Sequence, residues 1–319
     1  MSYRLRAGEG TACGLRRIAF EELTSAAGLL EDSTARTRDE AIHETRKSIK
    51  KTRALLRAVS PKLEGGYQLE NRRLRDLGHK LSPYRDTVAM IEIFDQFREE
   101  YRKTANGRAR IPAAIRQDLV RRKRAQSGGK GIVAAVRQAA AALMAASRRV
   151  EKWPIEGEEF ETIAAGLEKA YRRGRKAMSA ARRHRAAEYS HEWRKRVKDH
   201  WYHIRLLEDV WTGKMDDYEK RLKELETLLG DHHNMEVLWE KVAARVRPDG
   251  TNQAVRECLE QMHRYQRDLR RRALAVGKEV YRESPPDLIQ HMRKLWEEWQ
   301  SPPAAAPAIL KPGIEVGIS

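Results

Sequence analysis

The sequence predicts an all-α protein that consists of two related helical halves. Apolar residues recur at helical spacing through most of the chain, alternating strand patterns are almost absent, and one motif returns in the second half. Of the 319 residues, 40% are hydrophobic and 34% are charged, and the mean hydropathy is −0.76. This composition is typical of a globular protein built from amphipathic helices.

Nine helices are predicted from the apolar periodicity and from the Pro, Gly and Ser residues that interrupt it. They cover roughly residues 9–31, 37–60, 64–105, 130–150, 157–187, 189–212, 215–246, 251–283 and 286–299. Between the third and fourth helices, Pro112 lies in a polar connector whose basic run, Arg121–Arg124, is interpreted as a solvated surface. A short strand-like segment, Tyr3–Arg6, precedes the first helix, and the Pro/Ala-rich end from Ser301 is expected to be disordered.

An internal repeat relates the two halves. The segment HETRKSIK at residues 43–50 returns as HEWRKRVK at residues 191–198, an offset of 148 residues. The same offset, without a gap, places Leu74, Leu77 and Leu81 on Leu222, Leu225 and Leu229. A register held through a helix, a turn and the next helix is hard to produce by chance. It therefore predicts duplicated bundles of about four helices, a first at about 9–150 and a second at about 157–283.

The charge balance indicates a polyanionic partner. Lys and Arg total 64 against 46 Asp and Glu, which gives a net charge of +18 and favours nucleic acid, an anionic membrane or another polyanion. The two cysteines, Cys13 and Cys258, are far apart and match no metal-type spacing, so a reducing compartment is the simpler interpretation. Neither a signal-type N-terminus nor a run of 18 apolar residues occurs, so the expected location is cytoplasmic and no membrane partner is expected.

The repeated motif places its basic residues on one helix face in each half, and we call these faces the two cationic stripes. The first stripe contains His43, Arg46, Lys47, Lys50, Arg53 and Arg57, and the second contains His191, Arg194, Lys195, Lys198 and Arg205. Glu44, Glu192 and Asp199 lie to the side of these faces. Solvated helix faces usually mix signs, because like charges one turn apart repel by about 0.2–0.5 kcal/mol per pair. The uniform sign therefore predicts a bound anion.

The residue types suit phosphate chemistry. Arg presents a planar fork that bonds two phosphate oxygens, Lys acts as a point charge, and a His beside phosphate shifts toward its charged form. Further basic residues lie one helix upstream of each stripe and are weaker candidates for the same surface. They are Arg16, Arg17, Arg172, Arg173 and Arg175.

A metal site is the alternative interpretation of the histidines in the second half. These are His200, His203, His232 and His233, with Asp231 and Glu236 nearby in the sequence. No His-Glu-x-x-His pattern and no di-iron Glu-x-x-His set is present, and His200 and His203 fall on the core side of their helix. Walker A, G-x-G-x-x-G and G-x-S-x-G patterns are also absent. The sequence therefore predicts a non-enzymatic protein without metal or cofactor, while the roles of His232 and His233 stay open.

These motifs together resemble the CHAD family, the conserved histidine α-helical domains. The resemblance rests on the opening Tyr3-Arg4-Leu5, Glu9 and Arg16-Arg17, the two stripes, and the paired leucine segments that end at Tyr84-Arg85-Asp86 and Gly230–Asn234. It implies a CHAD-like domain over residues 1–283, with two four-helix bundles related by a pseudo-twofold axis, and a short helix and tail over 284–319. It also implies non-catalytic binding of inorganic polyphosphate by the stripes, and association with cytoplasmic polyphosphate granules.

RNA or single-stranded DNA is the alternative ligand. Such sites usually add exposed aromatic rings for base stacking, and the stripes offer only Trp201 and Tyr202, both in the second half. The first stripe has no aromatic residue, which favours a polyanion without bases.

Overall fold

The computed structural model describes residues 3–60, 66–104, 112–127, 130–211, 213, 215–244 and 253–301, and the part described is all-α. Its helices are α1 (Thr11–Glu31), α2 (Arg38–Val59), α3 (Gly66–Lys80), α4 (Ser82–Thr104), α5 (Ala113–Ser127), α6 (Lys130–Val150), α7 (Glu161–Arg183), α8 (Ala187–Leu206), the 3-10 helix η1 (Glu208–Val210), α9 (Asp216–Ala243), α10 (Gln253–Val280) and α11 (Pro285–Gln300). No described helix is long and apolar enough to cross a bilayer. The expected Pro/Ala-rich tail beyond Ser301 lies outside the described residues.

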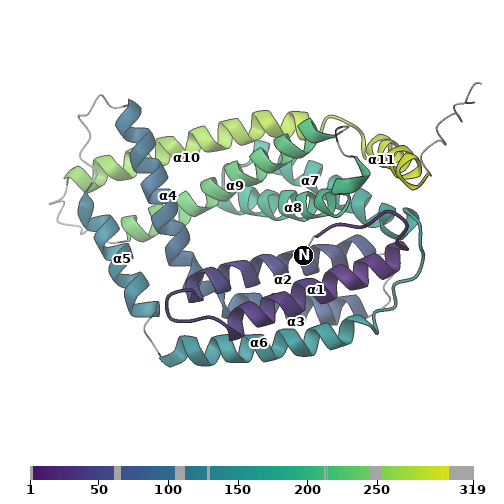
Figure 1. Ribbon diagram of the computed structural model, residues 1–319. Coiled ribbons are helices and arrows are strands. Elements are labelled where there is room, and N and C mark those ends of the chain that lie inside the picture. The colour runs from purple at the N-terminus through teal and green to yellow at the C-terminus, as the bar shows by residue number, and fades with distance from the viewer. Residues whose placement is uncertain are drawn as a thin grey trace, which may run out of the picture.

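The helices form two sets that lie against each other (Figure 1). In the lower set of the view, α1 packs on α2 and α6, and α2 packs on α3. In the upper set, α7 packs on α8, α8 on α9, and α9 on α10. The two sets meet chiefly where α2 packs on α7 and α8, so the helices that carry the two cationic stripes are neighbours.

The core consists of two hydrophobic clusters. The larger one joins both helix sets and contains fully buried side chains such as Leu15, Ile42 and Trp193. The smaller cluster lies at one end of the molecule, where Phe94 and Phe97 of α4 and Leu119 of α5 pack on α9 and α10. Although α4 follows α3 in the chain, its apolar face is thus buried against helices of the second half.

The helix predicted over 64–105 is wrong at one point, because the structure divides it into α3 and α4 at Leu81. Pro83 explains the break: its ring clashes with the preceding turn of a helix, whereas it fits the first turn of a new one. The equivalent region of the second half contains Gly230 and Asp231 instead of proline, and α9 runs through it without interruption.

Other boundaries also differ from the expectation. The basic connector contains a helix, α5, because Pro112 precedes an uninterrupted run of residues that tolerate helix. The helix expected over 189–212 ends at Leu206, and the short 3-10 helix η1 follows it. The segment at Tyr3–Arg6 forms no strand, but the backbone N–H of Leu5 donates to the Leu206 carbonyl at 2.9 Å.

Close backbone approach fixes α2 against the second half. A Cβ atom placed on Gly166 of α7 would lie 1.7 Å from the carbonyl oxygen of Ala58 in α2, so only glycine fits there. One turn away along α2, the buried His203 ring of α8 hydrogen-bonds through Nε2 to the Ala54 carbonyl at 2.8 Å. These contacts set how far apart the stripes of α2 and α8 lie.

Candidate functional site

A groove of about 480 Å³ opens between α2, α3 and α8. We call it the cationic groove, and its basic lining residues are Arg46, Lys50, Arg53, Arg57, Arg75, His79, His191, Arg194, Lys195, Arg196 and Lys198. Eight of these residues belong to the two predicted stripes. The stripes therefore face one common space, although they are separated by 148 residues in the chain.

On the α2 side, the basic residues differ in how the protein holds them. Arg46 donates to the Gly78 carbonyl at 2.6 Å and to the Ser82 hydroxyl, so its guanidinium caps the break between α3 and α4. Arg53 donates to Asn71 Oδ1 at 3.0 Å. Lys50 lies between them and makes no hydrogen bond or ion pair within the described residues.

On the α8 side, a buried carboxylate organises the lysines. Glu226 of α9 accepts from Lys198 at 2.7 Å and from Lys223 at 2.8 Å. Arg194 lies beside this group, but its Nε is shut off from solvent and has no hydrogen-bond partner among the described residues. Since a buried donor without a partner costs about 1–3 kcal/mol, the position favours an acceptor that the protein itself does not supply.

The acidic residues beside the stripes do contact them, contrary to the sequence interpretation. Asp199 of α8 accepts from Arg57 of α2 at 2.8 Å, which ties the two stripes together across the groove. Glu192 lies 3.6 Å from Lys195, and Glu44 lies 2.9 Å from Lys47. The stripes are thus partly compensated at their edges, whereas Lys50 and Arg194 in the middle are not hydrogen-bonded to any of these carboxylates.

The pKa values in the groove reflect burial and repulsion between like charges. Burial, followed by the charges of Lys198, Arg46 and Arg194, lowers the pKa of Lys50 well below the ordinary lysine value. Burial likewise lowers the pKa values of Arg194 and Lys198. Burial alone would raise the pKa of Glu226, but Lys198 and Lys223 lower it to about 2. An anion in the groove would relieve this repulsion.

A histidine pair lies at one end of the groove. The rings of His191 and His233 are 4.6 Å apart between centroids, and His191 Nδ1 is buried with no hydrogen-bond partner in the described part of the chain. Burial and the charges of Lys195 and Arg194 lower the pKa of His191, and burial with Arg194 lowers that of His233 to about 3. Both rings are therefore neutral near neutral pH in the absence of ligand.

Three stripe residues lie outside the groove lining. His43 and Lys47 both approach Glu44, at 3.7 Å and 2.9 Å. The Arg205 guanidinium packs over the Trp201 ring, 5.4 Å from its centroid. These side chains are on the stripes, as predicted, but the structure does not bring them into the cationic groove.

The weaker candidates upstream of the stripes also lie outside the groove. Arg16 donates to the Trp153 and Ile155 carbonyls in the loop before α7, and Arg17 makes a two-bonded ion pair with Glu9. In the second half, Arg172 pairs with Glu168, Arg175 donates to the Glu283 carbonyl, and Arg173 is exposed. The hydrogen bonds of Arg16 and Arg175 hold loops of the fold.

The sequence analysis missed three basic lining residues. Arg75 and His79 are one turn apart on α3, on the side away from the buried Leu74 and Leu77. Their i,i+4 spacing shows in the sequence that the two side chains share a helix face. Nothing in the sequence, however, places α3 beside α8. Arg196 is on α8 itself, where it contacts Glu192 at 2.5 Å and Asp199 at 3.5 Å.

Two of the candidate metal ligands belong to the core. His200 and His203 are fully buried. His200 hydrogen-bonds to the Tyr218 hydroxyl at 2.6 Å, and His203 hydrogen-bonds to the Ala54 carbonyl at 2.8 Å. The prediction that they are core histidines is confirmed. Among the described residues, no group of three or more His, Cys, Asp or Glu side chains is arranged to hold a metal ion.

The aromatic residues of the second stripe are covered. Tyr202 is only 2% exposed and its ring meets Tyr3 edge-on at 6.1 Å. Trp201 is partly buried, and the Lys223 ammonium lies 4.4 Å from the centroid of its ring. Tyr202 therefore offers no face for a base to stack on, and two cations already pack on the Trp201 ring.

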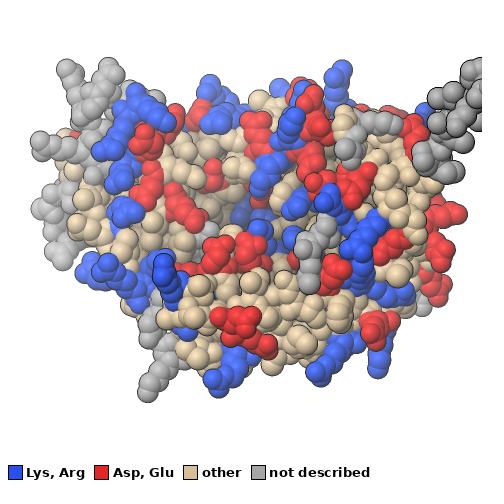
Figure 2. Space-filling view, in the orientation of Figure 1, with Lys and Arg blue, Asp and Glu red and all other residues tan. Residues whose placement is uncertain are grey.

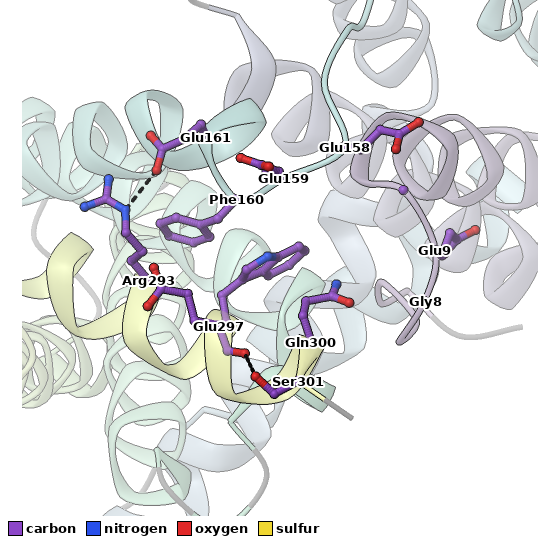
Figure 3. Close-up of a pocket in the computed structure, with 12 residues that line it drawn as sticks. Gly8, Glu9, Glu158, Glu159, Phe160, Glu161, Arg293, Glu297, Gln300 and Ser301 are labelled. Carbon is purple, nitrogen blue, oxygen red and sulfur yellow. Dashed lines mark hydrogen bonds and ion pairs between the residues drawn. The ribbon is translucent and has the colours of Figure 1, made fainter. Parts of the chain in front are cut away.

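A second cavity, of about 670 Å³, has the opposite charge (Figure 3). Carboxylates surround it from the segment before α1, from the start of α7 and from α11, and the single basic lining residue, Arg293, pairs with Glu161 at 2.8 Å. The acidic lining residues are Glu9, Glu158, Glu159, Glu161 and Glu297. Their field repels a phosphate chain, so this cavity is no candidate for the predicted ligand.

The described residues thus form an all-helical protein with a strongly basic groove. The chain belongs to the CHAD domain family, whose model matches residues 18–243. Membership implies a polyanionic ligand, and the family's domains generally bind rather than catalyse. Among solved structures, the chain is similar to the CHAD domain from the plant Ricinus communis, with a TM-score of 0.53 and 13% identity over 92% of this chain and 95% of that one. No match was found among curated proteins.

Proposed function

We propose that this protein binds inorganic polyphosphate, without catalysis, in the cationic groove. The observation that carries the proposal is the pair Lys50 and Arg194, which lie in the middle of the groove and donate no hydrogen bond to any described carboxylate. Unpaired, partly buried charges destabilise the folded protein unless an anion binds to them. A flexible chain of phosphates supplies several such anions in a row and suits both Lys and Arg.

The ligand contacts proposed are the eight stripe residues that line the groove. They are Arg46, Lys50, Arg53 and Arg57 of α2, and His191, Arg194, Lys195 and Lys198 of α8. We further infer that α2 and α8 correspond to each other through a gene duplication, an inference supported by the offset of 148 residues. Polyphosphate binding would place the protein at cytoplasmic polyphosphate granules.

Competition between ligands tests the proposal. Long-chain polyphosphate is expected to bind. Its affinity should fall steeply as the salt concentration rises, because the protein's Lys and Arg side chains displace counterions from the phosphate chain when it binds. At equal phosphate concentration, tRNA or single-stranded DNA should not displace it, because Tyr202 is buried and cations already pack on the Trp201 ring. Equal or better binding of the nucleic acid would show that the alternative ligand is the correct one.

Acidification is expected to strengthen binding. Burial and the Glu226 charge raise the pKa of Asp231, which lies close to Arg194, to about 6. As the pH falls from about 8 to about 5.5, Asp231 loses its negative charge, and phosphate favours protonation of His191. Isothermal titration of polyphosphate across this range measures the effect.

The substitution Asp231→Asn should raise the affinity at the alkaline end and flatten the pH profile. The matched control is Asp217→Asn, since Asp217 is 87% exposed and lies outside the groove lining. A wild-type affinity that falls on acidification would contradict this role of Asp231.

A further inference from the structure

A second basic cavity lies at the end of the molecule where α4 and α5 pack together. It measures about 670 Å³, and its lining residues are Arg98, Ala113, Arg116, Gln117, Val120, Arg121 and Arg124. We call it the α4–α5 arginine cavity. Of the seven described residues that line it, four are arginines and none is acidic. In Figure 2, Lys and Arg gather over this left-hand end of the molecule, with some acidic residues between them.

The carboxylates beneath the cavity hold its arginines in place. Asp95 of α4 accepts two bonds from Arg116, at 2.8 and 2.9 Å, and lies 3.7 Å from Arg98. The hydrogen bond from Arg116 lowers the pKa of Asp95, so this carboxylate stays ionised and keeps the guanidinium oriented. Asp118 contacts Arg121 at 3.3 Å, but the Arg121 side chain remains 77% exposed.

Positive charge remains in excess after these pairs are counted. Between Arg116 and Arg124, α5 carries five basic residues and a single acidic one. Lys123 pairs with Asp39 at the start of α2, at 2.8 Å. This ion pair anchors α5 to α2. Arg124 is exposed, lines the cavity and makes no ion pair within the described residues. Like charges this dense on one helix destabilise it unless an anion is bound.

The chemistry of the cavity favours phosphate groups without bases. Guanidinium forks match phosphate oxygens in geometry and charge, and none of the described lining residues is an aromatic on which a base could stack. The cavity and the cationic groove are both lined by residues of α4. Ser82 lines that groove and Arg98 lines the cavity, and both belong to α4, so the helical rise separates them by roughly 24 Å.

We propose that the α4–α5 arginine cavity is a second phosphate-binding site, which holds a further stretch of the polyphosphate chain that occupies the cationic groove. This inference rests on the proposed function. A chain long enough to reach both sites gains affinity because its second contact is intramolecular, whereas a short chain gains nothing. The protein would therefore select long chains by the distance between its two basic sites.

The test compares tripolyphosphate with long-chain polyphosphate, using the full chain with Arg121→Ala and Arg124→Ala. Both side chains are exposed, and alanine favours helix, so α5 is expected to persist. The affinity for the long chain should fall about tenfold, and the slope of log affinity against log salt should decrease by about two, one for each lost contact. The affinity for tripolyphosphate should not change.

The matched control is Arg182→Ala with Arg183→Ala, which removes the same charge from an exposed part of α7 and should leave both affinities unchanged. Long-chain binding equal to this control, or an equal loss for tripolyphosphate, would refute the second site. A loss confined to single-stranded RNA would also refute it and assign the cavity to nucleic acid. If the wild-type protein bound no polyphosphate at all, the proposed function itself would fail.

Discussion

Replacing Lys50 and Arg194 together by glutamine is expected to weaken polyphosphate binding at least roughly 100-fold while making the protein more stable. A hydrogen bond to a charged group contributes about 1.5–3 kcal/mol, so losing two of them accounts for the affinity change. The stability should rise by roughly 1–2 kcal/mol, because the substitutions remove two partly buried like charges. Isothermal titration and urea unfolding measure the two effects.

The opposite signs separate a ligand-binding role from a structural one. If these residues held the fold together, replacing them would destabilise the protein, and the ligand affinity would fall only as a consequence. The control, Arg182→Gln with Lys220→Gln, removes the same charge from exposed positions and should change neither quantity by much. A less stable Lys50/Arg194 variant would mean that these side chains have partners essential to the fold, and unchanged affinity would place the ligand elsewhere.

The pH dependence of stability gives an independent check on Lys50. Its pKa in the folded protein is lowered, so the unfolded chain binds more protons than the folded one between the lowered and the ordinary lysine pKa. The stability of the wild type should therefore rise as the pH increases through that window. The double variant lacks Lys50 and should lack this gain.

The helices with strict apolar periodicity were predictable from sequence. In α2 and α8 the buried residues, such as Ile49 and Val197, recur at helical spacing, which by itself fixes the side on which the basic residues lie. The helix α5 was missed because Leu119 is its one fully buried described residue, so its sequence shows little apolar periodicity, although its residues tolerate helix. A helix that buries little apolar surface shows little of the periodicity by which helices are predicted.

The stripes were predictable, but the pairing inside the groove was not. The ion pair between Arg57 and Asp199 joins residues 142 positions apart. Which carboxylate Arg57 meets depends on how α2 packs against α8. Glu226 was overlooked for the same reason, since it lies on α9 and reaches Lys198 only after the helices pack. Side-chain identity thus predicts the chemistry of a site, whereas tertiary packing decides which charges stay unpaired.

Substituting Gly166 by alanine is expected to have the largest effect on stability. The added Cβ would lie 1.7 Å from the Ala58 carbonyl oxygen, and because that atom belongs to the backbone, α2 and α7 must move apart. Overpacking of this kind costs about 3 kcal/mol or more. Polyphosphate affinity should fall with it, because the displaced α2 carries four of the groove's basic residues away from α8. Thermal unfolding and ligand titration measure both.

The matched control is Gly28→Ala in α1, where no described atom outside the local helix backbone lies within 4 Å of the added Cβ. Alanine there should stabilise the protein by about 0.5–1 kcal/mol, because it reduces the freedom of the unfolded chain and favours helix. The two substitutions add the same methyl group to a helix interior, so opposite outcomes would isolate the contact between α2 and α7. If Gly166→Ala unfolded at the same temperature as Gly28→Ala, with unchanged affinity, this close approach would not determine the geometry of the groove.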